Sequence, residues 1–137
     1  MIFPSIKFTL ILLFVTIAAQ AQLAVTVFPV KVAGQKVLIP LTLANRFPTK
    51  IESARAVCFL LDDQGTMIGQ TAKWVIGQNK TGLAPDATNR FNFVITSPRP
   101  FVATNLIAKV SFSRVVLEGG KLADVRQQVL LTNAKVP

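Results

Sequence analysis

The sequence predicts an all-β fold, a sandwich or a barrel of about seven strands, and three observations support this class. Apolar residues alternate with polar ones along several short segments, which is the pattern of half-buried strands. Turn signals rich in Gly, Pro and Asp separate these segments at fairly even spacing, and no segment shows convincing helical periodicity. Hydrophobic residues make up 51% of the 137-residue chain, which is enough for one packed domain and argues against disorder.

The beginning of the chain has the three-part layout of a secretory signal peptide. Lys7 and the free amine give a weakly positive start, Phe8 to Ala19 is almost wholly apolar, and an Ala-Gln-Ala sequence ending at Ala21 precedes the expected cleavage point. The apolar run is about 12 residues long, whereas a membrane-spanning helix needs about 20, so cleavage is favoured over anchoring. We therefore expect a signal peptide over 1–21 and a single β-sandwich domain over 22–137, periplasmic or secreted, with no transmembrane segment in the mature chain.

The first part of the mature chain carries the clearest strand patterns. A strand interrupted at Pro29 is expected over about 23–32. Lys36 to Ala44 alternates strictly, and Pro40, which lacks an amide hydrogen, places that strand at an edge or gives it a bulge. Ile51 to Asp62 is apolar on both faces, which predicts a central strand that is buried on both sides or shared between the core and an interface.

A tight hairpin turn and a longer connection are expected next. In the sequence Asp62-Asp63-Gln64-Gly65, an Asp side chain can bond to the backbone that follows it and Gly tolerates a positive φ, so the turn leads into a returning strand over Thr66 to Ile76. Gly77 to Thr88 is the longest turn-rich stretch and is expected to cross between the two sheets.

The last part of the chain predicts three further strands. Arg90 to Ile95 alternates. A strand from Leu106 to Leu117 shows a one-residue phase slip before Val115, which is typical of a β-bulge. Gly119-Gly120 predicts a two-residue hairpin turn, followed by a strand over about Val125 to Leu131. Two facing sheets would bury the apolar residues of all these strands.

Three of these segments resemble FxLYD-type domains of exported bacterial proteins. Cys58 to Gly69 is similar to their strand–turn–strand, Gly82 to Phe91 is similar to their L-x-P-G-x-x-x-x-F corner, and Pro40 to Asn45 is similar to the preceding strand, which ends in Asn. The likeness covers about residues 36–96. It implies an immunoglobulin-like antiparallel sandwich that serves as a binding or structural module without a shared catalytic site, so it supplies no functional residues.

The chain departs from the family pattern at three positions. It contains no Tyr, and Leu61 stands where the family has its tyrosine. Cys58 stands in the place of the first Phe. Asp86 stands in the place of a corner Gly, and an Asp adopts the left-handed backbone conformation less readily than a Gly does.

The composition removes much of the chemistry that enzymes use. The chain has no His and one Cys, which excludes Ser-His and Cys-His nucleophile pairs, His-ligated zinc and an intrachain disulfide. Asp62-Asp63 can be interpreted as paired catalytic acids or calcium ligands. Neighbours on a strand point to opposite faces, however, and the Gly that follows favours a turn. The remaining acidic residues are scattered singly: Glu52, Asp86, Glu118 and Asp124.

The other candidate residues favour structural roles. Cys58 lies in an apolar run, where a thiol is usually buried and inert. Trp74 can anchor a partner, but its neighbours Val75 and Ile76 favour a position capping the core. Asn79-Lys80-Thr81 matches the N-glycosylation acceptor pattern and is expected to stay unused, because the leader and the family resemblance point to a bacterial source. Nucleophile motifs are lacking around Ser53, Ser97, Ser111 and Ser113.

The excess of basic residues is the property of the sequence that says most about possible binding partners. Without Lys7 the chain keeps 14 of its 15 basic residues and 6 acidic ones, a formal balance of +8. The basic residues are dispersed and no regular aromatic interleaving accompanies them, so specific nucleic-acid binding is not expected. A dispersed basic surface maintains solubility, and it can also bind anionic envelope polymers or lipid headgroups.

The sequence therefore predicts a non-enzymatic binding or structural module of the bacterial cell envelope, with no catalytic residue, cofactor or metal site. Its partner is expected to be another envelope protein or an anionic polymer, and its oligomeric state is open. The alternative is a basic polyanion-binding protein. A small hydrolase using two carboxylates is the weakest hypothesis, because it needs two acids about 5–9.5 Å apart in a cleft.

Overall fold

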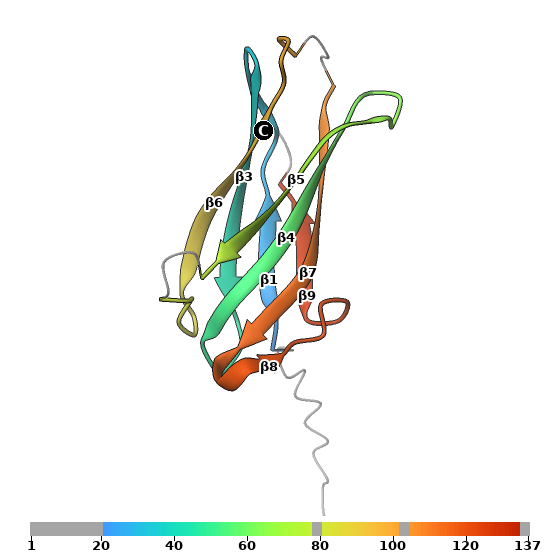
Figure 1. Cartoon of the computed structure of the whole chain (residues 1–137). Coiled ribbons are helices and arrows are strands. Elements are labelled where there is room, and N and C mark those ends of the chain that lie inside the picture. The colour runs from blue at the N-terminus through green and yellow to red at the C-terminus, as the bar shows by residue number, and fades with distance from the viewer. Residues whose placement is uncertain (1–20, 78–80, 102–104, 135–137) are drawn as a thin grey trace, which may run out of the picture.

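Two β-sheets packed face to face form the protein in the computed structural model, which describes residues 21–77, 81–101 and 105–134 (Figure 1). The five-stranded sheet A has the order β2-β3-β1-β9, with β6 on the other edge of β3. The four-stranded sheet B has the order β5-β4-β7-β8. The strands of sheet A are β1 (Leu23–Val27), β2 (Lys31–Ala33), β3 (Lys36–Asn45), β6 (Thr88–Thr96) and β9 (Val129–Asn133). Those of sheet B are β4 (Ile51–Leu61), β5 (Met67–Ile76), β7 (Ile107–Leu117) and β8 (Lys121–Leu122).

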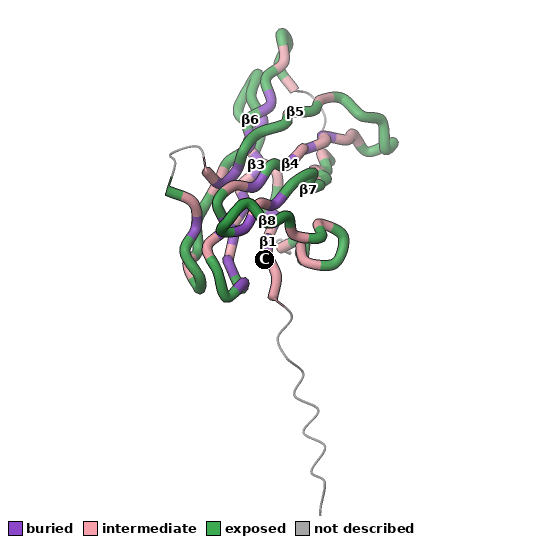
Figure 2. Tube along the Cα trace, turned by 60° about the horizontal axis from the view of Figure 1, so that its bottom comes forward, coloured by how far each residue is buried: buried purple, intermediate pink, exposed green. Residues whose placement is uncertain are grey.

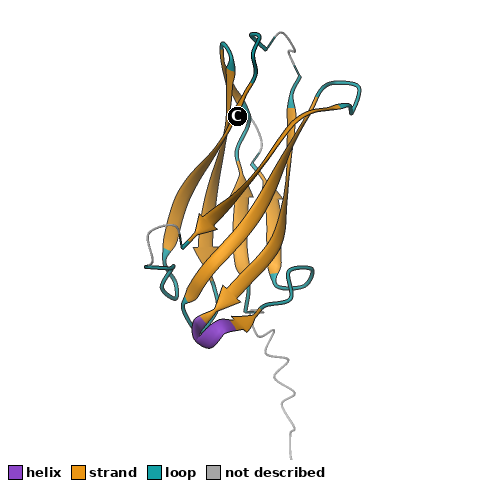
Figure 3. Cartoon of the chain, in the orientation of Figure 1, coloured by secondary structure: helices purple, strands orange, loops and turns teal. Residues whose placement is uncertain are grey.

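The predicted all-β sandwich of two facing sheets is confirmed. All but one of the strand pairs are antiparallel, and the exception is β9, which runs parallel to β1. The described residues form nine strands instead of about seven, because the first expected strand is broken in two and the two-residue β8 carries no alternation to read. One 3-10 turn over Glu118–Gly120 is the only helical element among the described residues (Figure 3).

The core lies between the inner faces of the two sheets, where buried segments from both sheets meet (Figure 2). On β3 the predicted inward set is fully buried, and the intervening residues are half-buried. Each large apolar side chain that is wholly removed from water stabilises the fold by about 1.5–3 kcal/mol. The inward set of β3 is Val37, Ile39, Leu41 and Leu43, and it faces the fully buried Ala54, Ala56, Cys58 and Leu60 of β4.

The prediction that Pro40 marks an edge strand or a bulge is wrong. β3 is central, with β6 along one side and with β1 and β2 along the other. Pro40 lies opposite the break between β1 and β2, where the backbone N–H of Phe28 donates to the Pro40 carbonyl at 2.9 Å. The missing amide hydrogen therefore faces a gap in the neighbouring strand, so no ladder hydrogen bond is lost.

A buried asparagine fixes the corner at the end of β3. The Asn45 amide nitrogen donates to the carbonyls of Thr49 (3.0 Å) and Leu83 (2.9 Å), and its side-chain oxygen accepts from the Phe47 N–H (2.8 Å). Asp86 has a φ of 61°, so this residue adopts the left-handed geometry despite its side chain, and its N–H donates to the Asn45 carbonyl. The side chain that ends β3 thus holds two loops together.

Two expected features, one bulge and one turn, can be compared with the structure here. The β7 bulge is confirmed, because Arg55 pairs with Arg114 and the next residue of β4 pairs with Phe112, which leaves Ser113 as the extra residue. The Gly119-Gly120 connection is one residue longer than predicted, since β7 and β8 pair at Leu117 and Lys121.

The last strand begins later than expected. Asp124 forms a turn in which its carboxylate accepts from the Arg126 N–H at 3.0 Å and its carbonyl accepts from the Gln128 N–H at 2.7 Å. Val125 therefore lies in a turn, and β9 starts at Val129.

Candidate functional site

Most of one edge of β7 is open among the described residues. β8 covers only Val116 and Leu117, and the N–H of Ala123 donates to the Val115 carbonyl at 2.9 Å. No described strand pairs with residues 107–114 on this side, because β9 pairs with β1 instead. Alternate backbone N–H and C=O groups along this stretch are therefore available to another extended chain.

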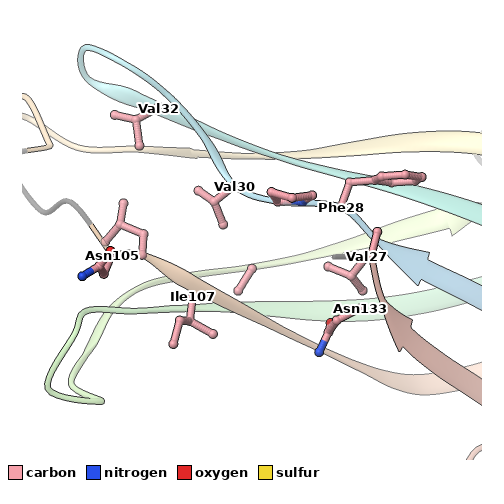
Figure 4. Close-up of a pocket in the computed structure, with 11 residues that line it drawn as sticks. Val27, Phe28, Val30, Val32, Asn105, Ile107 and Asn133 are labelled. Atoms are coloured by element: carbon pink, nitrogen blue, oxygen red, sulfur yellow. The ribbon is translucent and has the colours of Figure 1, made fainter. Parts of the chain in front are cut away.

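An apolar groove of about 420 Å³ lies beside this edge (Figure 4). Val27, Val30 and Val32 lie on its sheet A side, and Ile107 lies on its β7 side (Figure 4). The groove lies between the segment that joins β1 to β2 and the beginning of β7. Its other lining residues are Phe28, Pro29, Leu106, Ala108 and Ala134, together with Asn105 and Asn133, the two polar ones.

The inward residues along the open edge of β7 are apolar. Ala108, Val110 and Phe112 lie opposite the fully buried Leu60, Cys58 and Ala56 of β4. A strand that paired with the β7 edge would therefore extend an apolar layer that already exists.

Trp74 lies on the outer face of sheet B, so the prediction that it caps the core is wrong. Its side chain is 40% exposed and lies opposite Arg55, so it does not cap the core. A register shift between Ala54 and Arg55 leaves Val75 as an extra residue on β5, and Val75 and Ile76 enter the core in its place. β4 is a central strand, as expected, and on this outer face its residues Val57, Phe59 and Leu61 are half-buried.

Cys58 is buried, as expected. None of its side chain is exposed, and desolvation by burial raises the pKa of the thiol from 9.0 to about 11. The thiolate, which is the reactive form, is therefore scarce at neutral pH.

The turn interpretation of Asp62-Asp63 is confirmed. The Asp62 carboxylate accepts from the N–H groups of Gln64 and Thr66, both at 2.9 Å, and Gly65 has a φ of 76°. Within the described ranges, no three residues among His, Cys, Asp and Glu group together as a metal site requires. Asn79 and Lys80 of the glycosylation pattern lie outside the described residues.

The strands carry far more basic than acidic side chains. Eight basic residues and one acidic residue, Glu52, lie on described strands, while the other described acidic residues occupy turns and connections. The basic ones are Lys31, Lys36 and Arg90 on sheet A and Arg55, Lys73, Lys109, Arg114 and Lys121 on sheet B.

Sequence reasoning missed the groove and the open edge. The break at Pro29 was visible, but nothing local in the sequence of β9 shows that it pairs with β1 and leaves β7 uncovered. In the part of the chain that the structure describes, no helix has the length and hydropathy needed to cross a bilayer.

Comparison with known proteins yields little. No family model matches the chain, and no curated protein matches it. A solved structure described as "X-ray structure of Northeast Structural Genomics Consortium target SoR45" is similar with a TM-score of 0.47 and 12% sequence identity, covering 74% of this chain and 76% of that chain.

Proposed function

We propose that the mature protein is a non-enzymatic binding module, exported to the bacterial cell envelope, which holds an extended segment of another envelope protein along β7. The observation that carries this proposal is the uncovered stretch of β7 beside an apolar groove. In strand addition, main-chain hydrogen bonds supply affinity for any extended segment, and pockets for alternate side chains supply selectivity. The occupant expected here has apolar side chains at every second position.

Export is part of the same proposal and is supported by the layout of residues 1–21. An immunoglobulin-like topology and a relationship to FxLYD-type domains are proposed on the residues that carry the likeness. The turn at Asp62 and the left-handed Asp86, which follows the loop anchored by Asn45, are consistent with that likeness.

Site-specific photo-crosslinking tests the function. Ile107 on β7 and Met67 on β5 lie on either side of Leu61, and each is 54% exposed, so they form a matched pair. A photoreactive residue at 107 should give one saturable adduct in envelope extracts, and the same residue at 67 should give none. Adducts of equal yield at both positions, or at neither, would contradict strand addition at β7.

A second variant separates the groove from the rest of the surface. Ala108→Arg places a charge in the groove and should abolish the adduct at 107, because that charge would have to be desolvated beneath the partner strand. Val94→Arg makes a similar change on β6, where the residue is 44% exposed, and should leave the adduct unchanged. Persistence of the adduct in Ala108→Arg, with an unaltered melting temperature, would argue against the groove.

Polyanion binding is the second candidate function, favoured by the eight-to-one excess of basic residues on the strands. Affinity for an anionic polymer should fall steeply with salt, by about one log unit per log unit of salt for each charge neutralised. Binding that is absent or insensitive to salt would remove this candidate and leave the first untouched.

A further inference from the structure

A row of three side chains crosses the outer face of sheet B. Arg55 on β4 lies directly opposite Trp74 on β5 and Arg114 on β7. Directly opposed residues of antiparallel strands point to the same face, with Cβ atoms about 4.5–5.5 Å apart. Ala54 and Ala56, which flank Arg55, are wholly buried, so Arg55 and the other two residues of the row point outward.

Two β-bulges bring this row into line. The register of β4 shifts against β5 between Ala54 and Arg55, and it shifts against β7 between Arg55 and Ala56. The extra residue on β7 is Ser113, whose hydroxyl donates to the Arg55 carbonyl at 3.3 Å. Bulges re-aim side chains and are over-represented next to functional sites. Here both bulges meet at one arginine.

The row places two positive charges side by side. Arg55 and Arg114 are both exposed, and like charges directly opposite one another destabilise a sheet. Glu52, the only acidic residue on β4, is held by the Gly119 N–H, which donates to its carboxylate at 3.1 Å. An oxyanion between the two guanidinium groups would replace repulsion with charge-assisted, bidentate hydrogen bonds.

Trp74 separates two shallow hollows of different character. One, of about 330 Å³, is lined by Arg55, Ser113, Arg114 and the indole. The other, of about 290 Å³, is lined by Ser53, Ile76, Gly77 and the indole. A Cβ at Gly77 would lie 2.7 Å from the Glu52 carbonyl, so this position stays without a side chain. A ligand that spans both hollows needs an anionic group on one side and a body that packs against an aromatic ring.

We propose that this row binds an acidic polysaccharide, with the carboxylate or sulfate of one sugar unit between Arg55 and Arg114 and the sugar ring against Trp74. The inference rests on the second candidate function and names its site and ligand class. A single exposed indole is not the run of stacking aromatics that single-stranded nucleic acids use. Basic side chains occupy both sheets, whereas a protein that lies on an anionic membrane presents them on one face.

The only tryptophan of the chain provides the direct readout. Titration with polygalacturonate or dextran sulfate should shift or quench the Trp74 emission, whereas neutral dextran should not. The variant carrying Arg55→Gln and Arg114→Gln should lose about tenfold or more in affinity, since it removes the charge-assisted hydrogen bonds to the anionic group. Its salt dependence should also flatten by about two charges.

A charge-matched control distinguishes binding at a specific site from attraction to the overall positive charge of the protein. Lys36→Gln with Arg90→Gln removes the same charge from exposed positions on sheet A and should lower the affinity by less than about threefold. An equal loss in both double variants would overturn the site and leave polyanion binding in place. No binding by the unaltered protein would overturn both. Tighter binding to single-stranded DNA or to vesicles of anionic lipid would overturn the ligand class. Melting temperatures verify that each variant is folded.

Discussion

The two long edge strands of sheet B differ in what they present toward the core. On β5 the residues opposite Ala56, Cys58 and Leu60 are Lys73, Thr71 and Gly69. On β7 the residues opposite the same three are Phe112, Val110 and Ala108. A lysine on the inner face of an edge strand prevents another strand from pairing there, because its ammonium group would be buried. β5 carries that protection and β7 lacks it.

The two long sides of the sandwich also differ in how closely the two sheets approach each other. β5 lies against β6, and a Cβ at Gly69 would come within 2.8 Å of the Ile95 side chain, so the two sheets meet closely there. Between β7 and the Phe28–Val32 segment, a groove takes the place of that contact. One side of the sandwich is thus sealed by its own residues, whereas the other has a groove beside a strand edge that no described strand covers.

The largest expected effect compares two phenylalanines on the two sides. Phe93 of β6 is fully buried, and Phe93→Ala should cost about 3–5 kcal/mol of unfolding free energy. Phe28 lines the groove and is 37% exposed, so Phe28→Ala should cost about 1 kcal/mol or less. Urea denaturation of both variants measures the difference. Similar losses would mean that the groove is as well packed as the core.

The next effect concerns the corner at the end of β3. Asn45→Ala removes the partner of the buried Phe47 N–H and the side-chain donors to the Thr49 and Leu83 carbonyls, of which the Leu83 carbonyl keeps the Ile51 N–H. A buried group left unsatisfied costs about 1–3 kcal/mol. We expect a loss of at least about 2 kcal/mol. Asn92→Ala, at an exposed position on β6, should change stability by less than about 0.5 kcal/mol. A neutral Asn45→Ala would disprove the anchoring role.

The ionisation and labelling of the Cys58 thiol show whether solvent reaches the core from the side of the sandwich that has the groove. The unfolded thiol ionises above pH 9.0 and the folded thiol near 11, so the unfolded state loses its proton first and stability falls between these values. The decline, on the order of 2 kcal/mol, should be absent from Cys58→Ala. At pH 8 a thiol reagent should label Cys58 only on unfolding. Rapid labelling of the folded protein would show that the groove reaches the core.

The smallest expected effect on stability comes from removing the protection of β5. Lys73→Val should change the unfolding free energy by less than about 0.5 kcal/mol, since the side chain is exposed. It should nevertheless produce concentration-dependent dimers in sedimentation, because the inner face of the edge becomes apolar. The control Thr71→Val changes the neighbouring inward position but keeps Lys73, so its sedimentation should be the same as that of the unaltered protein. Absence of dimers in Lys73→Val would weaken the comparison of the two edges.

Local patterns predicted most of the fold and little of the candidate site. Short local patterns are enough to predict three features of the fold, which are the alternation along Lys36–Asn45, the turn at Asp62 and the bulge at Ser113. The sequence does not predict the outward position of Trp74, because the bulge at Val75 changes which side chain faces the core and the β5 sequence does not reveal that bulge. The groove depends on the parallel pairing of β9 with β1, a long-range choice that alternation does not encode.

Amide hydrogen exchange of β7, with and without the partner captured at position 107, shows whether a strand adds to this edge. Strand addition predicts that alternate amides within residues 107–114 slow by about tenfold or more, as expected for about 1.4 kcal/mol per new hydrogen bond, while β5 amides stay unchanged. Protection confined to β5 or to the outer face of sheet B, with β7 unaltered, would contradict it.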